Sequence, residues 1–159
     1  MAEPSEKYIL LRERTGEELM KNSRPLDNFE MYTLTEVLRG ELFEGFFKAG
    51  STMVTFRGIR NKLLRLECPA EDMSRISEEE CNLLLAIAST EERYETWMDR
   101  HRLLFARQLL PGSAVFVEVE GISKILPGIV RYRGILPSSF GTWFGVELIV
   151  SRSFNLPPL

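Results

Sequence analysis

The stretch Gly128-Ile129-Val130-Arg131-Tyr132-Arg133-Gly134 predicts a β-strand, and a second strand is predicted in Gly141-Thr142-Trp143-Phe144-Gly145-Val146-Glu147-Leu148. Apolar and basic side chains alternate over residues 130–133, which predicts one apolar face and one basic face. Glycines bracket the connecting loop, where a positive φ or a close approach of the backbone is expected. The two stretches therefore predict a strand pair that organises the C-terminal part of the chain.

These stretches resemble the first half of a CAP-Gly domain, whose pattern is a G-x-V-R-Y-x-G run, a loop, and then G-T-W-x-G-V-E-L. Residues 111–119 resemble the opening strand of the same module. Residues 83–148 as a whole are similar to the segment that leads into, and begins, the first CAP-Gly domain of a deubiquitinase. The resemblance implies a partial SH3-like β-barrel over residues 109–150.

The resemblance also implies a partner-binding site. CAP-Gly domains recognise extended, acidic C-terminal peptides, often ending Glu-Glu-Tyr, with an aromatic-lined groove and donors that hold the terminal carboxylate. Trp143 and Phe144 match the aromatic positions of the family pattern. Arg131 and Arg133 supply positive charge. We expect these four residues to form the site, and a core anchor in the small barrel remains an open alternative for Trp143.

The chain departs from the family pattern after Leu148. A CAP-Gly domain continues with a glycine-rich loop of the G-K-N-D-G type, and no residue of 149–159 matches it. Residues 151–159 are therefore expected to be a tail that follows a module cut near its middle. Without this loop, we expect peptide binding to be weak.

The rest of the chain predicts an α+β protein. Residues 1–70 favour an irregular β-rich region, with strands expected near residues 8–11 and 53–56. For residues 31–47 the sequence does not decide between a helix and short strands. The apolar residues fall near the helical period, but Gly40 and Gly45 disfavour a helix. Residues 71–108 predict a helical segment, followed by the partial barrel.

The helical segment begins with a capping box. The Ser77 hydroxyl is expected to accept from the Glu80 amide, and the Glu80 carboxylate to reach back. Helices are expected over residues 78–88 and 91–105. Side chains at three- to four-residue spacing form one stripe along these helices, which we expect to pack on neighbouring strands. The alternative is that the stripe forms a groove for a partner. The stripe comprises Tyr94, Trp97, Met98, His101, Leu104 and Phe105.

Composition excludes several classes of function. The formal net charge of −3 over 159 residues gives no broad attraction to nucleic acid or membranes. Cys68 and Cys81 are the only cysteines and His101 is the only histidine, without the paired spacing of a zinc site or a motif for a Cys–His pair. The sequence also lacks a glycine-rich phosphate loop. We therefore expect no catalytic residue, no metal site and no cofactor.

Three functions remain open, and the last of them is a degenerate protein with only a scaffold function. The first is a non-catalytic interaction module whose partner is a protein or an acidic C-terminal peptide. The resemblance gives this module a cytoplasmic setting linked to ubiquitin signalling or the cytoskeleton. The second is a fragment of a longer cysteine deubiquitinase whose catalytic domain is absent here. The scarcity of cysteines favours a reducing compartment.

Overall fold

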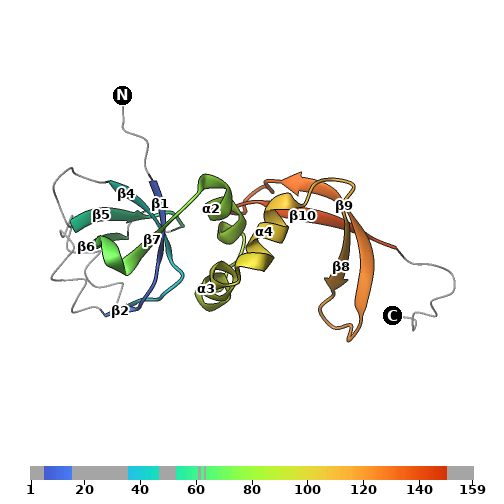
Figure 1. Ribbon diagram of the computed structural model, residues 1–159, viewed down its shortest axis with the longest axis horizontal. Helices are drawn as coiled ribbons and strands as arrows, with labels where there is room; N and C mark the ends of the chain where they lie inside the picture. The colour runs from blue at the N-terminus through green and yellow to red at the C-terminus, as the bar shows by residue number, and fades with distance from the viewer. Residues whose placement is uncertain (1–5, 16–35, 47–52, 61, 63, 150–159) are drawn as a thin grey trace, which may run out of the picture.

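The computed structural model describes residues 6–15, 36–46, 53–60, 62 and 64–149. A β-sheet lies at one end of the described region, a group of helices in the middle and a second sheet at the other end (Figure 1). Both larger sheets are antiparallel. The predicted mixed α+β class is therefore confirmed. Within these residues, no helix is long and apolar enough to cross a membrane.

The N-terminal sheet has the strand order β6-β5-β4-β1-β7. Its strands are β1 (Glu6–Leu10), β4 (Leu42–Phe46), β5 (Met53–Gly58), β6 (Arg65–Pro69) and β7 (Met73–Ile76). A 3₁₀ turn, η2 (Ala70–Asp72), joins β6 to β7. Since β7 pairs with β1, this sheet continues beyond residue 70 and ends at Ile76, inside the range expected to be helical.

Both faces of this sheet are buried. Tyr8 and Phe43 belong to a core cluster on one face, where the Tyr8 ring lies edge-on to the Phe56 ring at 5.2 Å between centroids. Ile9 and Leu42 belong to a second cluster, which they share with the helices. The alternation follows from the two-residue period of a strand. Each fully buried large side chain contributes about 1.5–3 kcal/mol.

Residues 36–46 settle the open choice between a helix and short strands in favour of strands. Here β3 (Glu36–Val37) pairs with β2 (Arg14–Thr15), and a turn leads into β4. Gly40 in this turn has φ 93°, and a Cβ there would lie 2.1 Å from the Thr90 carbonyl oxygen. The turn can therefore approach the helices only with glycine at this position.

Three helices follow among the described residues: α2 (Glu78–Leu85), α3 (Thr90–Met98) and α4 (Arg100–Gln108). The predicted cap at Ser77 is confirmed, since its Oγ accepts from the Glu80 amide at 3.1 Å. The Glu80 carboxylate accepts from the Ser77 hydroxyl, also at 3.1 Å. Ser89 caps α3 in the same way, through the Glu92 amide.

The prediction of one continuous helix over residues 91–105 is wrong. Asp99 ends α3 with ψ 88°, and its carboxylate caps α4 by accepting from the Arg102 amide at 3.1 Å. Aspartate favours such caps because its short side chain bonds nearby amides. The break divides the expected apolar stripe. Trp97 is buried, whereas Met98, His101, Leu104 and Phe105 are exposed, and Leu103 is buried in their place.

Arg93 joins the helices to the N-terminal sheet. Its side chain is 1% exposed. Its Nε donates to the carbonyl of Leu84, in the last turn of α2, at 3.2 Å. Its Nη2 donates to the carbonyl of Ile87, two residues after the end of α2, at 2.7 Å. The negative end of the helix dipole favours a cation there. Burial lowers the pKa of Arg93.

The C-terminal sheet is a meander in the order β10-β9-β8. Its strands are β8 (Ala114–Glu118), β9 (Ile125–Gly134) and β10 (Trp143–Leu148). The predicted strand pair is β9 with β10. The register of the β9–β10 ladder shifts between two neighbouring residues of β10. Gly145 pairs with Tyr132, whereas Val146 pairs with Val130. Arg131 is therefore left without a partner in the ladder. This β-bulge decides the geometry of the site.

Candidate binding site on the C-terminal sheet

The loop before β10 is fixed to helix α2. The Thr142 amide donates to the Asn82 carbonyl at 2.8 Å. Gly141 has φ 80°, and a Cβ there would lie 2.3 Å from the same carbonyl oxygen. The loop therefore needs glycine both for its dihedral angle and for its contact with the helix. This contact positions Trp143 and Phe144 at the start of the strand.

Phe144 and Arg133 face the helices. They are partners in the β9–β10 ladder, and paired residues share a face of the sheet. Phe144 packs against the core cluster shared by the helices. The Arg133 guanidinium lies 5.6 Å from the centre of the Phe144 ring. Both side chains therefore hold the sheet against the helices.

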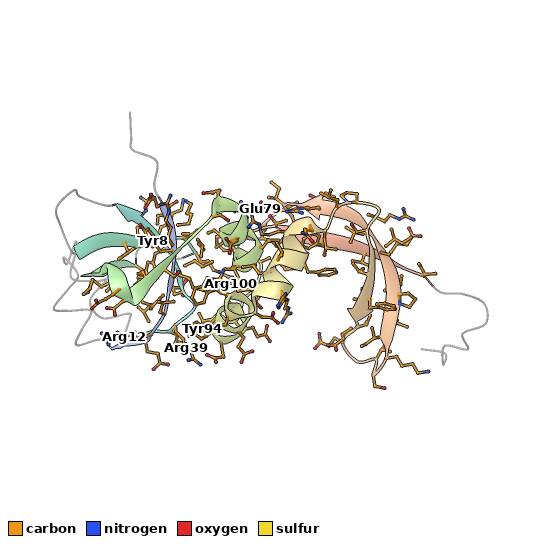
Figure 2. The ribbon with its side chains drawn as sticks, viewed as in Figure 1. Tyr8, Arg12, Arg39, Glu79, Tyr94 and Arg100 are labelled. Carbon is orange, nitrogen blue, oxygen red and sulfur yellow. The ribbon has the colours of Figure 1, made fainter. Side chains whose placement is uncertain are left out.

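Arg133 has hydrogen-bond partners on two helices. Its Nη1 donates to the carbonyl of Leu109 at 2.6 Å and to that of Arg107 at 2.9 Å, at the C-terminal end of α4. Its Nη2 lies 3.1 Å from the Glu79 carboxylate on α2. Figure 2 labels Glu79 on the helix beside this sheet. These contacts occupy the Arg133 side chain within the protein.

Trp143, Tyr132 and Arg131 lie on the opposite, outward face. The bulge places Tyr132 opposite Gly145, and a Cβ at Gly145 would lie 3.0 Å from the Tyr132 Cβ. Trp143 is 36% exposed, and its ring nitrogen donates to the Phe140 carbonyl at 2.8 Å. The exposed Arg131 pairs with Glu147 at 3.3 Å.

The predicted alternation of an apolar and a basic face is wrong beyond Val130. A regular strand would place Tyr132 beside Val130 and Arg131 beside Arg133. The β-bulge instead places Tyr132 on the same outward face as Arg131, and turns Arg133 towards the helices. An extra residue in one strand reverses the facing of every residue that follows.

The four predicted binding residues therefore form two pairs on opposite faces. Trp143 and Arg131 are exposed on the outward face, whereas Phe144 and Arg133 contact the helices. Sequence reasoning missed Tyr132 as a candidate, because alternation with Val130 assigned it to the apolar face of the strand. Its hydroxyl donates to the Ile135 carbonyl, which holds the ring over Gly134.

Cys68 and Cys81 are both buried. Burial raises the pKa of the Cys81 thiol to about 12, so that it is protonated at neutral pH. His101 is exposed on α4. Within the described ranges, no group of three or more His, Cys, Asp or Glu side chains could hold a metal ion.

Sequence comparison finds relatives for half of the chain. It is 38% identical over 82 residues to the ubiquitin carboxyl-terminal hydrolase CYLD of Homo sapiens and of Bos taurus, and 39% identical to that of Mus musculus. Half of this chain is CYLD-like. The match covers 50% of the chain and only 9% of each CYLD sequence.

No protein-family model matches the chain. No solved structure matches it either. The similarity to CYLD is therefore a similarity of sequence over 82 residues.

Proposed function

We propose that this chain is a non-catalytic protein-interaction module whose C-terminal sheet forms part of a CAP-Gly-type barrel. The proposed ligand is an acidic C-terminal peptide, bound weakly on the outward face of β9 and β10. The similarity to CYLD, a ubiquitin carboxyl-terminal hydrolase, supports a setting in ubiquitin signalling. A cytoplasmic, cytoskeleton-associated location belongs to the same proposal.

One observation carries the proposal: Trp143 is held rigidly on an outward face with its polar group already satisfied. Its ring nitrogen is bonded to the Phe140 carbonyl, so the exposed part of the ring offers apolar area at little entropic cost. Tyr132 and Arg131 share this face. An aromatic ligand side chain and a carboxylate are the complementary groups.

The same geometry supports low affinity. Arg133 is bonded to the carbonyls of Arg107 and Leu109 at the C-terminal end of α4 and to Glu79, so its donors are already used within the protein. Arg131 would exchange its exposed partner Glu147 for a ligand carboxylate, and exposed ion pairs contribute about 0–1 kcal/mol. Stacking on Trp143 is therefore the main contribution expected from these residues.

The test is a titration of the full chain with a peptide ending Glu-Glu-Tyr, at low and at physiological salt. We expect a dissociation constant in the millimolar range that weakens as salt is added. Trp143→Ala should abolish the signal and Arg131→Ala should reduce it, both with the fold retained. A peptide amidated at its C-terminus serves as the control for carboxylate recognition.

Two results would contradict this proposal. Binding that is unchanged by Trp143→Ala would place the ligand elsewhere on the chain. Low-micromolar binding that resists salt would show that contacts other than Trp143 and Arg131 dominate. In both cases circular dichroism must show that the variant has kept the secondary structure of the parent chain.

The non-catalytic part of the proposal has its own test. A ubiquitin-based probe that reacts with catalytic cysteines should form no adduct with the chain, because the Cys81 thiol is buried and protonated. Ubiquitin chains should remain uncleaved. An adduct that disappears in Cys68→Ala or Cys81→Ala would establish a catalytic cysteine and overturn the proposal.

A further inference from the structure

The turn after β5 carries an arginine, Arg60, that reaches the end of α2. The amide of the neighbouring Ile59 donates to the Leu42 carbonyl at 3.1 Å, which fixes the backbone of this turn to the N-terminal sheet. The Arg60 Nη1 donates to the Ile87 carbonyl at 3.0 Å and to the Leu85 carbonyl at 3.4 Å. Carbonyls at the C-terminal end of a helix lack partners within the helix, so they favour a cation there. Arg60 therefore joins the N-terminal sheet to α2 at a defined position.

The same guanidinium lies against the loop that precedes β10. Its Cζ is 5.0 Å from the centre of the Phe140 ring, within the range of a cation–π contact. Phe140 is 44% exposed, and it belongs to neither core cluster of the described residues. The contact with Arg60 therefore restrains a ring that the core does not hold.

Phe140 in turn holds the indole of Trp143. The Phe140 carbonyl accepts from the Trp143 ring nitrogen at 2.8 Å. Between these two residues, the Thr142 amide is bonded to the Asn82 carbonyl, which keeps the backbone of the loop on α2. Arg60, Phe140 and Trp143 thus form a continuous series of contacts from the N-terminal sheet to the outward face of the C-terminal sheet.

We propose that Arg60 is a positioning residue for Trp143 and acts through Phe140, so that the N-terminal sheet contributes to the order of the exposed indole. A restrained ring loses little conformational freedom when a ligand binds, whereas a mobile ring must be ordered by the ligand. Because Thr142 keeps the loop backbone on α2, loss of the guanidinium should affect mainly the two aromatic side chains. The consequence for peptide affinity rests on the proposed function, whereas the ordering of the indole does not.

NMR of the full chain with ¹⁵N-labelled tryptophan tests this positioning. The chain has two tryptophans, and Trp143→Phe assigns their two indole signals. In Arg60→Ala, the heteronuclear NOE of the Trp143 indole should fall, and its hydrogen exchange with water should quicken at least about threefold. The signal of Trp97, which is buried in α3, should stay unchanged.

Three further variants serve as controls. Arg57 lies in β5, just before the turn that carries Arg60, and its guanidinium pairs with Glu44 at 2.9 Å. Arg57→Ala should therefore leave the Trp143 indole unchanged. Phe140→Leu removes the aromatic face but keeps the carbonyl, so it should reproduce the effect of Arg60→Ala. Phe140→Tyr keeps an aromatic face for the guanidinium and should behave as the parent chain does.

Several results would overturn the proposal. A Trp143 indole that keeps its NOE and its exchange rate in Arg60→Ala and in Phe140→Leu is one of them, and an equal change in Arg57→Ala is another. Effects that add in the double variant of Arg60→Ala and Phe140→Leu would also overturn it, because both substitutions should remove the same contact. If Arg60→Ala does not fold, the comparison of Phe140→Leu with Phe140→Tyr decides.

Peptide titration separates this inference from the proposed function. Where the parent chain binds the peptide through Trp143, Arg60→Ala should raise the dissociation constant about threefold, and Arg57→Ala should not change it. A parent chain that does not bind the peptide contradicts the proposed function and leaves the indole result standing. Binding that depends on Trp143, together with an indole that is unchanged in Arg60→Ala, contradicts this inference alone.

Discussion

The guanidinium of Arg93 donates a hydrogen bond to the carbonyl oxygen of Gly40, with 2.9 Å between Nη1 and the oxygen. These residues lie 53 positions apart in the sequence. The bond joins the N-terminal sheet to α3, while the same side chain bonds the Leu84 and Ile87 carbonyls at the end of α2. Arg93 thus connects three parts of the fold through one buried cation.

Arg93→Ala is expected to lower the free energy of unfolding by about 2–4 kcal/mol, because it leaves several buried carbonyls without a donor. Urea unfolding measures the change. Arg39→Ala is the control, since Arg39 pairs with Glu91 at the surface and its loss should leave the urea midpoint nearly unchanged. Figure 2 shows Arg39 at the edge of the molecule. Similar midpoints for the two variants would contradict the role of Arg93.

Two leucines of the helical segment should differ sharply. Leu84→Ala should cost about 2–5 kcal/mol, because Leu84 is fully buried in the core cluster shared with the sheet. Leu104→Ala should change stability by no more than about 0.5 kcal/mol, because Leu104 is 52% exposed. Thermal or urea unfolding of both variants compares the same substitution at two levels of burial. Equal losses would show that α4 packs differently.

Gly141→Ala is expected to be more destabilising than Gly112→Ala. Both glycines have positive φ, 80° and 99°, so the strain of placing alanine there, about 1–2 kcal/mol, is common to both. Only at Gly141 would the new Cβ meet the backbone of α2, because nothing lies within 4 Å at Gly112. We expect a further loss of about 1–3 kcal/mol from this overlap. Equal losses in thermal unfolding would contradict the docking of this loop on the helix.

Stability should fall at alkaline pH, partly through Cys81. Burial raises the pKa of this thiol from 9.0 to about 12, so the folded state retains a proton that the unfolded state releases. Its contribution is complete below about pH 9 and is lost as pH rises towards about 12. Burial likewise raises the pKa of Tyr8 to about 12, which adds to the decline above about pH 10.

Cys81→Ala isolates the thiol. The variant should lose a constant amount of stability from the small cavity, but its urea-derived stability should fall less steeply than that of the parent between about pH 9 and pH 11. Parallel stability curves for the two proteins would show that Cys81 does not titrate with folding.

Local patterns in the sequence determined several elements. The capping box at Ser77 placed the start of α2, because the hydroxyl and the amide that it bonds lie three residues apart. Alternating apolar residues and flanking glycines predicted β9 and β10 correctly, because two strands joined by a short loop are also specified by nearby residues. Trp143 and Arg131 lie on the outward face of these strands, and their role in binding a partner stays a prediction.

The tertiary structure decided which face each side chain occupies. The bulge at Arg131 depends on how β9 registers against β10, and it turned Tyr132 outwards and Arg133 towards the helices. Arg93 follows two glutamates in the first turn of α3, and packing against the Gly40 carbonyl makes it a core residue. Burial of such groups is a property of distant segments brought together, so no local spacing of residues specifies it.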